Sequence, residues 1–491
     1  MAPGLFTHHT HTQDGHIDDQ ADALALLRKE SLDIFNRIHS IAEDVLFVEV
    51  VGKAYPGLPV LRTEFAVWGL ASPYAAYFKS TDGHYNNWSF SLRRPNIHLL
   101  PVVVQHGGLI LVDSTRAGKR MPDALSKTVP VWCAVINRAV RKAYSKGEEW
   151  NEKLYTPPGV VPPQEHAQIE ALVEEWAEAL VNSSYTLPDL AHPLRPLWIT
   201  PATSVFPALP PSKSEGRKFY PVICVSASKQ ILVDGLDRRS NGFAYVQGSG
   251  DDHELWGMGL TPQMFWREKD QLLEATRSDL PERVAEIVAK HRSERRDEWV
   301  THPTSVTKSG GGRLLISAVA DLPLSLSTFL PHPDSDDAEG RYLAHVVISD
   351  KDTLTSFTLS SEERKDVLLL ELAAGKKGQA GFLNVVLPQA IAFIGTQLAA
   401  EGGSRDVCVS CHSGKDVGVG VVLAALQVFF DDEGEFRSDD ETSGEREIIA
   451  DKQSLATRLQ WIISDRPEAN PSRATLKRVN EFLLTSPALR R

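Results

Sequence analysis

Features that would assign this chain to a special class are scarce. Four cysteines in 491 residues are too few for a disulfide framework, so we expect reduced thiols and a cytoplasmic protein. The apolar runs, such as residues 98–112, are interrupted by Pro, His and Gly before they reach the roughly 20 residues of a membrane helix. The N-terminal segment has neither the basic nor the apolar region of a secretion signal. Together these absences predict a soluble chain with no membrane partner.

Positive charge is also in the minority. The 52 Lys and Arg residues are outnumbered by 64 Asp and Glu residues, and the formal net charge of −12 is unfavourable for a polyanionic partner. Nucleic-acid binding depends on the local field, however, and basic residues gather in four short stretches. These are Arg93 and Arg94; Arg116, Lys119, Arg120 and Lys127; Arg138, Arg141 and Lys142; and Arg292, Arg295 and Arg296. Any of them could be a solvated helix face, and only the second lies in a candidate phosphate loop.

The length exceeds what one hydrophobic core normally serves, so the sequence predicts two domains. Residues 1–20, which carry four His residues, are expected to be a disordered tail. Strand and helix patterns then alternate through an N-terminal α/β domain at 21–310. Residues 311–340 have little periodicity and are predicted to be a linker or long loop, before a second α/β domain at 341–491. Within that domain we expect a helix over 361–373.

One loop of the second domain has the clearest physics. An apolar strand ends at Ser410, and a helical pattern starts at Val417. Free backbone N–H groups at such a helix start make an anion site. The spacing resembles the phosphate loop of dual-specificity phosphatases, but Val417 stands where that loop has its phosphate-binding Arg, so we expect phosphate binding without phosphatase activity. The expected phosphate-binding residues are Cys411, Ser413, Gly414, Lys415 and Asp416.

Cys408 and Cys411 also form a CxxC pair. A single pair without further ligands is weak evidence for zinc or redox chemistry. We expect Cys408 to be a buried strand residue and Cys411 to have no nucleophilic role.

A second strand ends at Asp113, before a loop of small, hydroxyl and basic residues. Asp113 among so many cations is explained either by a bound metal ion or by a salt bridge to Arg116. A charged surface loop without a ligand is the alternative for the whole segment. The expected donor-binding residues here are Ser114, Thr115, Arg116, Lys119, Arg120 and Lys127.

Two more loops, residues 79–84 and 247–254, combine small or hydroxyl residues with Asp and His. Activation of a hydroxyl group needs a base whose pKa is near neutrality, which a His or a perturbed carboxylate supplies. Either loop alone is more often an Asp-Gly turn with a solvated His. The candidate catalytic residues are Asp82, His84, Asp113, Asp251, Asp252 and His253, and Lys79 is a candidate phosphate ligand.

Six segments, in order, resemble the signature segments of the fungal and plant initiator-tRNA 2′-O-ribosyl phosphate transferases. They are residues 78–84, 86–100, 112–139, 247–266, 413–426 and 469–483. The resemblance implies a family-specific N-terminal α/β domain followed by a dual-specificity-phosphatase-like α/β domain. The sequence departs from the family pattern at residues 58–73, where LPVLRTEFAVWGLASP replaces an Arg-Cys-Gly followed by Trp-Tyr. Trp68 could keep the aromatic role.

The resemblance also implies a reaction. Phosphoribosyl pyrophosphate would donate its 5-phosphoribosyl group to the ribose 2′-hydroxyl of adenosine 64 in the T stem of initiator methionine tRNA, and the adduct would bar this tRNA from elongation. Mg²⁺ is the expected charge partner of pyrophosphate, with Asp113 and Asp251 as ligands. The expected contacts to tRNA are Arg93, Arg94, Arg138 and Arg473. The alternatives are a catalytically inactive phosphatase-like module that binds RNA or phosphoproteins, and an active phosphatase that uses Cys411.

Overall fold

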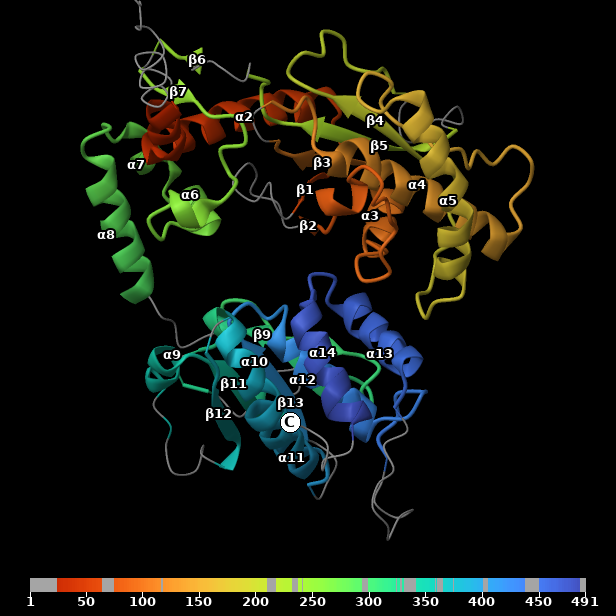
Figure 1. The fold of residues 1–491 in the computed structure, drawn as a ribbon, viewed down its shortest axis with the longest axis vertical. Coiled ribbons are helices and arrows are strands. Elements are labelled where there is room, and N and C mark those ends of the chain that lie inside the picture. Colours follow the sequence, from red (N-terminus) through yellow and green to blue (C-terminus); the bar gives the residue numbers. More distant parts are fainter. Residues whose placement is uncertain are drawn as a thin grey trace, which may run out of the picture.

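Two largely parallel sheets, one in each half of the chain, organise the structure (Figure 1). The computed structural model describes residues 24–63, 75–115, 118–209, 218–231, 237–240, 242–293, 299–323, 325–326, 329–330, 341–357, 359, 365–373, 375–400, 405–437 and 450–485. The predicted α/β fold class is confirmed in both halves. The tail expected at residues 1–20 lies outside the described part of the chain.

The N-terminal sheet has the order β2-β1-β3-β5-β4, and all its pairs are parallel. Its strands are β1 (Val60–Thr63), β2 (Ala75–Ala76), β3 (Leu109–Asp113), β4 (Leu194–Ile199) and β5 (Tyr220–Ser226). After β1 the chain adds β2 on one side and then crosses back to add β3 on the other. The strand order therefore reverses between β1 and β3, and open α/β sheets bind ligands beyond the carboxyl ends of the strands at such a point.

Helices cover both faces of this sheet. Successive residues of each strand point to opposite faces, and both faces are apolar. On one face, Val48 and Val51 of α2 pack with Ile110 and Val112 of β3. On the other, α3, α4 and α5 pack against Leu109 and the residues that share its face. A smaller cluster joins the first half of α2 to the short helices that follow the sheet. The helices are α2 (Ile34–Ala54), α3 (Leu99–His106), α4 (Val129–Tyr144), α5 (Pro163–Val181), α6 (Pro262–Arg267), α7 (Lys269–Glu274) and α8 (Leu280–Ser293), with a hairpin of β6 (Asp237–Arg238) and β7 (Ala244–Tyr245).

The C-terminal sheet has the order β10-β11-β13-β9-β8, and β12 also pairs with β11. Its strands are β8 (Thr304–Val306), β9 (Leu314–Ala318), β10 (Phe329–Leu330), β11 (Arg341–Ser349), β12 (Val367–Glu371) and β13 (Arg405–Cys411). Its helices are α9 (Lys351–Thr355), α10 (Gly378–Gly381), α11 (Leu387–Leu398), α12 (Val417–Phe429), α13 (Lys452–Asp465) and α14 (Arg473–Leu484). Strand β13 lies between β11 and β9 and leads directly into the loop before α12, as the sequence predicted.

Two sequence expectations are corrected here. The second sheet begins at Thr304, and β9 pairs in parallel with β13, so residues 311–340 are not simply a linker. Strands β8 and β9 also form an antiparallel hairpin, which the glycine-rich turn between them concealed in the sequence. The helix expected over 361–373 is also wrong, because Val367–Glu371 forms β12 against β11. A short leucine-rich run does not distinguish a buried strand from a helix by its periodicity.

One helical stretch, Gly378–Leu398, is long and apolar enough by composition to cross a membrane. Half of its apolar window is buried within the fold, and α11 packs against α12 and β13. A core helix of a globular domain has the same composition, and this packing accounts for the apolar sequence.

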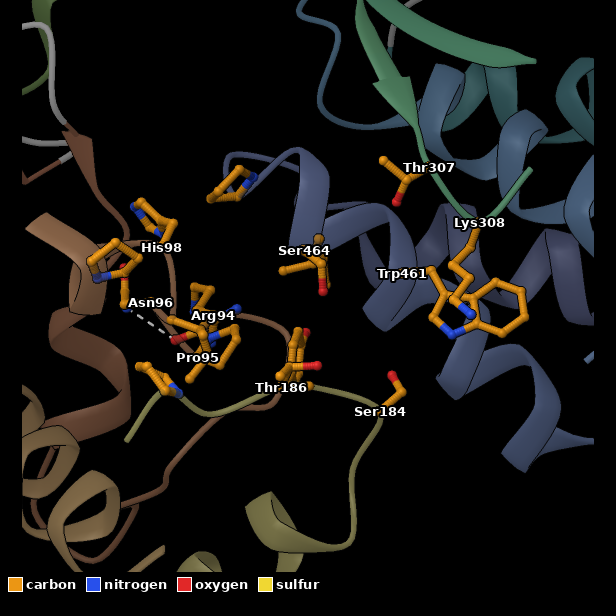
Figure 2. A pocket seen from close by; sticks show the side chains of 16 residues that line it. Arg94, Pro95, Asn96, His98, Ser184, Thr186, Thr307, Lys308, Trp461 and Ser464 are labelled. Carbon is orange, nitrogen blue, oxygen red and sulfur yellow. Dashed lines mark hydrogen bonds between the residues drawn. The ribbon is translucent and has the colours of Figure 1, made fainter. Parts of the chain in front are cut away.

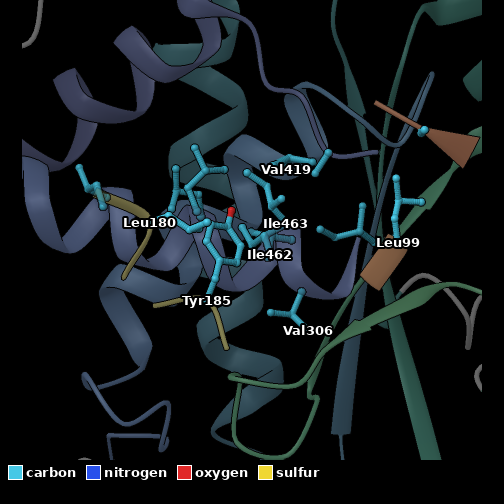
Figure 3. Packing of buried hydrophobic residues seen from close by; sticks show 14 of the residues in the cluster. Leu99, Leu180, Tyr185, Val306, Val419, Ile462 and Ile463 are labelled. Atoms are coloured by element: carbon cyan, nitrogen blue, oxygen red, sulfur yellow. The ribbon is translucent and has the colours of Figure 1, made fainter. Parts of the chain in front are cut away.

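The two domains share a continuous apolar contact (Figure 3). Leu180 and Tyr185 from the N-terminal domain belong to the same buried cluster as Ile462 and Ile463 of α13. Polar contacts border it: the backbone N–H and hydroxyl of Ser184 both donate to Gln460 Oε1, at 2.9 and 2.8 Å. The relative position of the domains is therefore set by packing as well as by surface hydrogen bonds.

Candidate functional site

Asp113 ends β3 at the reversal point of the N-terminal sheet and is only 1% exposed. Its Oδ1 accepts hydrogen bonds from Thr63 Oγ1 at 2.6 Å and from the backbone N–H of Ser114 at 2.9 Å. Burial raises the pKa of Asp113 to about 7, because these two hydrogen bonds only partly compensate for desolvation and the charge of Asp251 adds repulsion. No cation pairs with Asp113 among the described residues, and Arg116, its predicted salt-bridge partner, lies outside them. The structure thus presents a buried carboxyl group that titrates near neutrality.

Two buried hydroxyl groups lie beside Asp113. Ser114 follows it in the chain, and Ser226 is its partner in the register of β3 with β5. Within the described residues, the side-chain oxygens of both serines are buried and have no hydrogen-bond partner. Both hydroxyl groups lie at the carboxyl edge of a parallel sheet, which is where open α/β sheets commonly bind their ligands.

The lysines of the following loop are held by acidic side chains. Asp123 accepts from Lys119 at 2.7 Å and lies 3.0 Å from Lys127, which also contacts Glu165 at 3.2 Å. Burial alone would raise the pKa of Asp123, but the hydrogen bonds from both lysines outweigh it and hold that pKa below its usual range. Glu165 comes from α5 and could not be foreseen from the loop sequence.

Thr115, two residues after Asp113, is buried, while Arg120 is exposed. The side chains expected to bind the donor therefore differ in access. Lys119 and Arg120 are at the surface, and Lys127 is in the interior.

The 79–84 loop packs directly on this segment. Ser80 Oγ accepts from the backbone N–H of Ala124 at 3.2 Å, and Thr128 Oγ1 donates to the carbonyl oxygen of Lys79 at 3.0 Å. Gly83 permits the approach, since a Cβ there would lie 2.9 Å from the carbonyl oxygen of Asp123. His84 is half exposed and 3.8 Å from Asp123. The structure thus joins two of the three loops predicted in this domain.

Asp82 and Arg94 form a bidentate ion pair, with Arg94 Nη2 at 2.8 Å from Asp82 Oδ2 and 3.0 Å from Oδ1. Both side chains are largely buried. The sequence predicted that Arg94 contacts tRNA and that Asp82 is catalytic. In the structure these two side chains bind each other.

The third loop, residues 247–254, is positioned by α2. Arg37 Nη1 donates to the carbonyl oxygens of Gly248, Ser249 and Asp251 at 3.0 to 3.3 Å. Gln247 Nε2 donates to the carbonyl oxygen of Lys119 at 2.8 Å, which ties this loop to the second one. Asp251 is therefore near Asp113, as its effect on the Asp113 pKa also indicates. Sequence reasoning missed Arg37, although an Arg within an apolar helical stripe is a usable signal.

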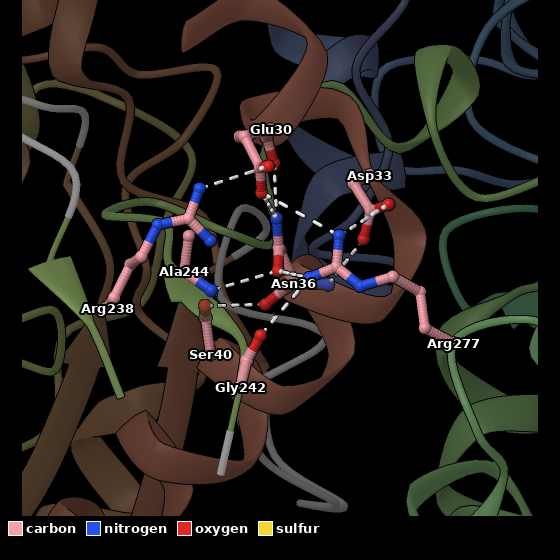
Figure 4. A network of polar contacts seen from close by, with 8 residues as sticks. All are labelled: Glu30, Asp33, Asn36, Ser40, Arg238, Gly242, Ala244 and Arg277. Atoms are coloured by element: carbon pink, nitrogen blue, oxygen red, sulfur yellow. Dashed lines mark hydrogen bonds and ion pairs between the residues drawn. The ribbon is translucent and has the colours of Figure 1, made fainter. Parts of the chain in front are cut away.

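The start of α2 fixes the chain entering this loop (Figure 4). Asn36 Oδ1 accepts from the backbone N–H of Ala244 at 2.9 Å, and Ser40 Oγ accepts from that of Val246 at 2.9 Å. By contrast, Asp252 is exposed, and His253 contacts its neighbour Glu254 at 3.8 Å.

The loop after β13 has the expected backbone form, but its cysteine is enclosed. Cys411 is 1% exposed, and Gly414 adopts a left-handed conformation with φ of 65°. Arg466 lies behind the loop and donates through Nε to the carbonyl oxygen of Gly414 at 2.9 Å. Asp416 Oδ1 accepts from the backbone N–H of Ser472 at 2.7 Å, which anchors the loop to the start of α14. The Cys411 side chain is therefore shielded from solvent in this arrangement.

The remaining side chains around this loop differ in exposure and in their contacts. Lys415 lies 3.7 Å from Glu468, and Ser413 is exposed. Cys408 is fully buried in β13, as predicted, and burial raises its pKa to about 12. Arg466 is the residue that sequence reasoning missed here, and nothing near it in the sequence signals its role.

Arg93 connects the C-terminal loop to the N-terminal domain. It donates to the carbonyl oxygen of Pro471, next to the segment that holds Asp416. Burial lowers the pKa of Arg93. The charges of Arg94 and Arg473 lower it further, and those of Asp416 and Asp82 oppose this shift. The 79–84 and 411–416 loops therefore approach Arg93 from opposite domains. Arg473 is exposed nearby, whereas Arg138 pairs with Glu170 and Glu174 of α5 and contributes to helix packing.

The carboxylates of Asp113 and Asp251 fit a metal ion that binds together with a phosphate ligand. They do not form a complete metal site by themselves. Among the described residues, no group of three or more His, Cys, Asp or Glu side chains could hold a metal. Asp113 and Asp251 supply two carboxylates. Mg²⁺ commonly uses one or two protein carboxylates, with water and substrate phosphates completing its octahedron, so this donor set fits Mg²⁺ bound with a phosphate ligand.

Comparison with known proteins agrees with both halves of this description. Residues 27–289 match the Rit1 N-terminal domain, and residues 366–483 match the Rit1 DUSP-like domain. A Saccharomyces cerevisiae protein named tRNA A64-2′-O-ribosylphosphate transferase is 31% identical over 492 aligned positions, covering 93% of each chain. An uncharacterized protein of Schizosaccharomyces pombe is 30% identical over 486 positions, covering 95% of this chain and 98% of the other.

Solved structures of phosphatase-like proteins are similar to part of this chain. The human tyrosine phosphatase-like serine/threonine/tyrosine-interacting protein is 13% identical, with a TM-score of 0.23, over 38% of this chain and 96% of that one. The Yvh1 phosphatase domain from Chaetomium thermophilum is 18% identical, with a TM-score of 0.21, over 30% and 82%. The two domain matches and the near full-length relatives show that this chain belongs to the Rit1 family, with a Rit1 N-terminal domain followed by a DUSP-like domain.

Proposed function

We propose that this chain transfers the 5-phosphoribosyl group of phosphoribosyl pyrophosphate to the ribose 2′-hydroxyl of adenosine 64 in initiator methionine tRNA. The name of the S. cerevisiae relative supports tRNA as the substrate and position A64 as the target. The anionic adduct would bar the initiator tRNA from elongation. The enzyme is thus proposed to be a pentosyltransferase that acts in the cytoplasm.

The observation that carries this proposal is the buried Asp113 at the reversal point of the N-terminal sheet. In the reaction, the 2′-oxygen forms a bond to the anomeric carbon of the donor, the bond from that carbon to pyrophosphate breaks, and a base removes the hydroxyl proton. A base that titrates near neutrality serves best. The raised pKa of Asp113 meets this need, and Thr63 orients its carboxyl group.

The residues around Asp113 supply the remaining requirements. The free hydroxyl groups of Ser114 and Ser226 would bind donor oxygens, since they have no other partner among the described residues. Asp113 and Asp251 would hold Mg²⁺, whose charge would stabilise the departing pyrophosphate. Lys119 and Arg120, at the surface of the adjoining loop, would attract the anionic donor.

The C-terminal domain is proposed to bind rather than to catalyse. Cys411 is enclosed, and Val417 replaces the Arg that would bind a phosphoryl group, so we do not expect hydrolysis of phosphate esters. The same observations favour the alternative function, a catalytically inactive phosphatase-like module that binds RNA or phosphoproteins. That alternative leaves the near-neutral carboxyl group of Asp113 without a role.

One assay separates the two functions. The protein is incubated with initiator tRNA, Mg²⁺ and phosphoribosyl pyrophosphate labelled in the ribose, and the label on tRNA is measured. The transferase should label tRNA but not a transcript with a 2′-deoxyadenosine at position 64. Absence of label from a folded protein that still binds tRNA would support the binding module instead.

The two roles of Asp113 can also be separated. If it mainly holds Mg²⁺, Asp113→Asn should lose transfer at low Mg²⁺ and partly recover at high Mg²⁺, with tRNA affinity unchanged. If it is the base, added Mg²⁺ should not restore the rate.

A further inference from the structure

A cleft of about 440 Å³ lies between the two domains (Figure 2). One wall comes from the N-terminal domain, from residues 94–98 and 184–188. The other comes from Thr307 and Lys308 in the turn between β8 and β9, and from the end of α13. The volume falls within the roughly 300 to 1,000 Å³ typical of ligand sites.

The lining of this cleft differs in charge from the rest of the chain. None of its 16 residues is Asp or Glu, although the whole chain carries 64 acidic residues and a net charge of −12. Exposed hydroxyl groups line both walls, from Ser184 and Thr186 on one side and Thr307 and Ser464 on the other. Ser184, Thr307 and Ser464 already donate to Gln460 Oε1, to Asp465 and to the carbonyl oxygen of Gln460, so their oxygens remain as acceptors for a ligand.

Each wall also carries a cation. Arg94 on the N-terminal wall is neutralised by Asp82. Lys308 on the opposite wall is exposed, and its Nζ donates to the carbonyl oxygen of Glu433 at 3.3 Å without forming an ion pair among the described residues. Asp465 accepts from the backbone N–H of Thr307 at 2.8 Å, and burial raises the pKa of its carboxyl group. Lys308 is therefore the cation of the lining that forms no ion pair among the described residues.

The cleft is preformed because the walls are joined beneath it. Ser184 bonds to Gln460 of α13, and Tyr185 packs in the apolar cluster shared with Ile463 (Figure 3). The Tyr185 hydroxyl donates to the carbonyl oxygen of Leu92 at 2.7 Å. A ligand in the cleft would thus meet groups whose positions are already fixed, which reduces the ordering cost of binding.

We propose that this cleft binds the ribose-phosphate backbone of the RNA substrate; the choice of tRNA as that substrate rests on the proposed function. Proteins recognise A-form RNA largely by shape and by contacts to 2′-hydroxyl and phosphate groups. Hydroxyl side chains and an exposed lysine without an ion pair among the described residues match that chemistry, and acidic residues are absent from the lining. Arg94 and Asp82 connect the cleft to the 79–84 loop, so RNA held here lies next to the loops around Asp113.

The test is tRNA binding without donor, measured by fluorescence anisotropy between 50 and 200 mM salt. We compare the wild type with Lys308→Ala, Ser464→Glu and a control, Lys351→Ala, which removes an exposed lysine that does not line the cleft. Each phosphate contact makes affinity fall about threefold over this salt range. Lys308→Ala should therefore bind more weakly at low salt and have a salt slope reduced by about one. Ser464→Glu should weaken binding further, and Lys351→Ala should match the wild type.

The outcomes are distinct. Wild-type affinity and salt slope in both cleft variants would overturn the assignment. In the transfer assay, Lys308→Ala should raise the KM for tRNA and leave the KM for the donor unchanged. Normal transfer with an unchanged KM for tRNA would refute only the cleft. Failure of the wild type to transfer label, with tRNA binding still dependent on Lys308, would refute only the proposed reaction.

Discussion

Replacement of Asp113 by Asn should change how the stability of the protein depends on pH. The folded-state pKa of Asp113 is raised to about 7 from 3.8, chiefly by burial. Between these two values the native state holds a proton that the unfolded state has lost. The stability associated with this group is therefore present below the unfolded pKa and is lost as pH rises to the folded pKa.

The magnitude follows from the pKa values. Each unit of difference corresponds to about 1.36 kcal/mol, and the group is still half protonated at its folded pKa. The wild type should therefore lose about 2.3 kcal/mol from this group between pH 5 and pH 7, and roughly 0.4 kcal/mol more above pH 7. Asn keeps an oxygen that accepts from Thr63 and from the backbone of Ser114, but it does not titrate. The Asn variant should thus gain stability relative to the wild type as pH rises from 5 to 8.

The assay is urea unfolding followed by tryptophan fluorescence at pH 5, 6, 7 and 8 for both proteins. Other buried acids, such as Asp44 with its pKa raised to about 8 by burial, are common to both chains and cancel in the comparison. Equal pH dependence in the two proteins, or a relative loss of stability in the Asn variant at pH 8, would refute the burial argument. Far-UV circular dichroism at pH 5 checks that the variant folds.

Three further predictions concern the surrounding residues. Thr63→Val removes the hydrogen bond that favours ionised Asp113, so the acidic limb of the pH profile of kcat/KM should move up by about one pH unit; an unmoved limb would contradict the role of Asp113 as base. Arg37→Met leaves three carbonyl oxygens of residues 248–251 without their buried donor and should lower stability by about 1.5 to 3 kcal/mol, with faster proteolysis of that loop; unchanged urea unfolding would contradict this. Cys411→Ser should keep most of the transfer activity, and the wild type should not hydrolyse p-nitrophenyl phosphate; loss of transfer from a folded Ser variant would restore a chemical role for the thiol.

The sequence predicted where the candidate loops begin because their positions follow from local patterns. Apolar β-branched runs end at Asp113 and near Ser410, and polar residues follow each run. In a parallel sheet, carboxyl ends share one edge, so a residue after a strand is placed by the strand itself. The buried state of Cys408 and the missing Arg at Val417 were also readable, since both depend on neighbours within a few residues.

The sequence was less informative where two structures share one pattern. The run at 367–371 is apolar without a clear period, and its strand state depends on pairing with β11. The domain boundary was displaced for a similar reason, because β9 gains its place only from its distant partner β13. Local sequence cannot report a hydrogen-bond partner about 90 residues away.

What the sequence determined by itself was the α/β class, the residue types in each loop and, through six ordered segments, the family. Only the tertiary structure decided which charges remain available. It paired Asp82 with Arg94 and Lys127 with Glu165, and it left Asp113 buried with Ser226 beside it. These outcomes depend on desolvation and on contacts between distant segments. Such contacts set the pKa of a carboxyl group and decide whether a lysine is ion-paired. The inter-domain cleft likewise exists only because α13 packs against the chain around Tyr185.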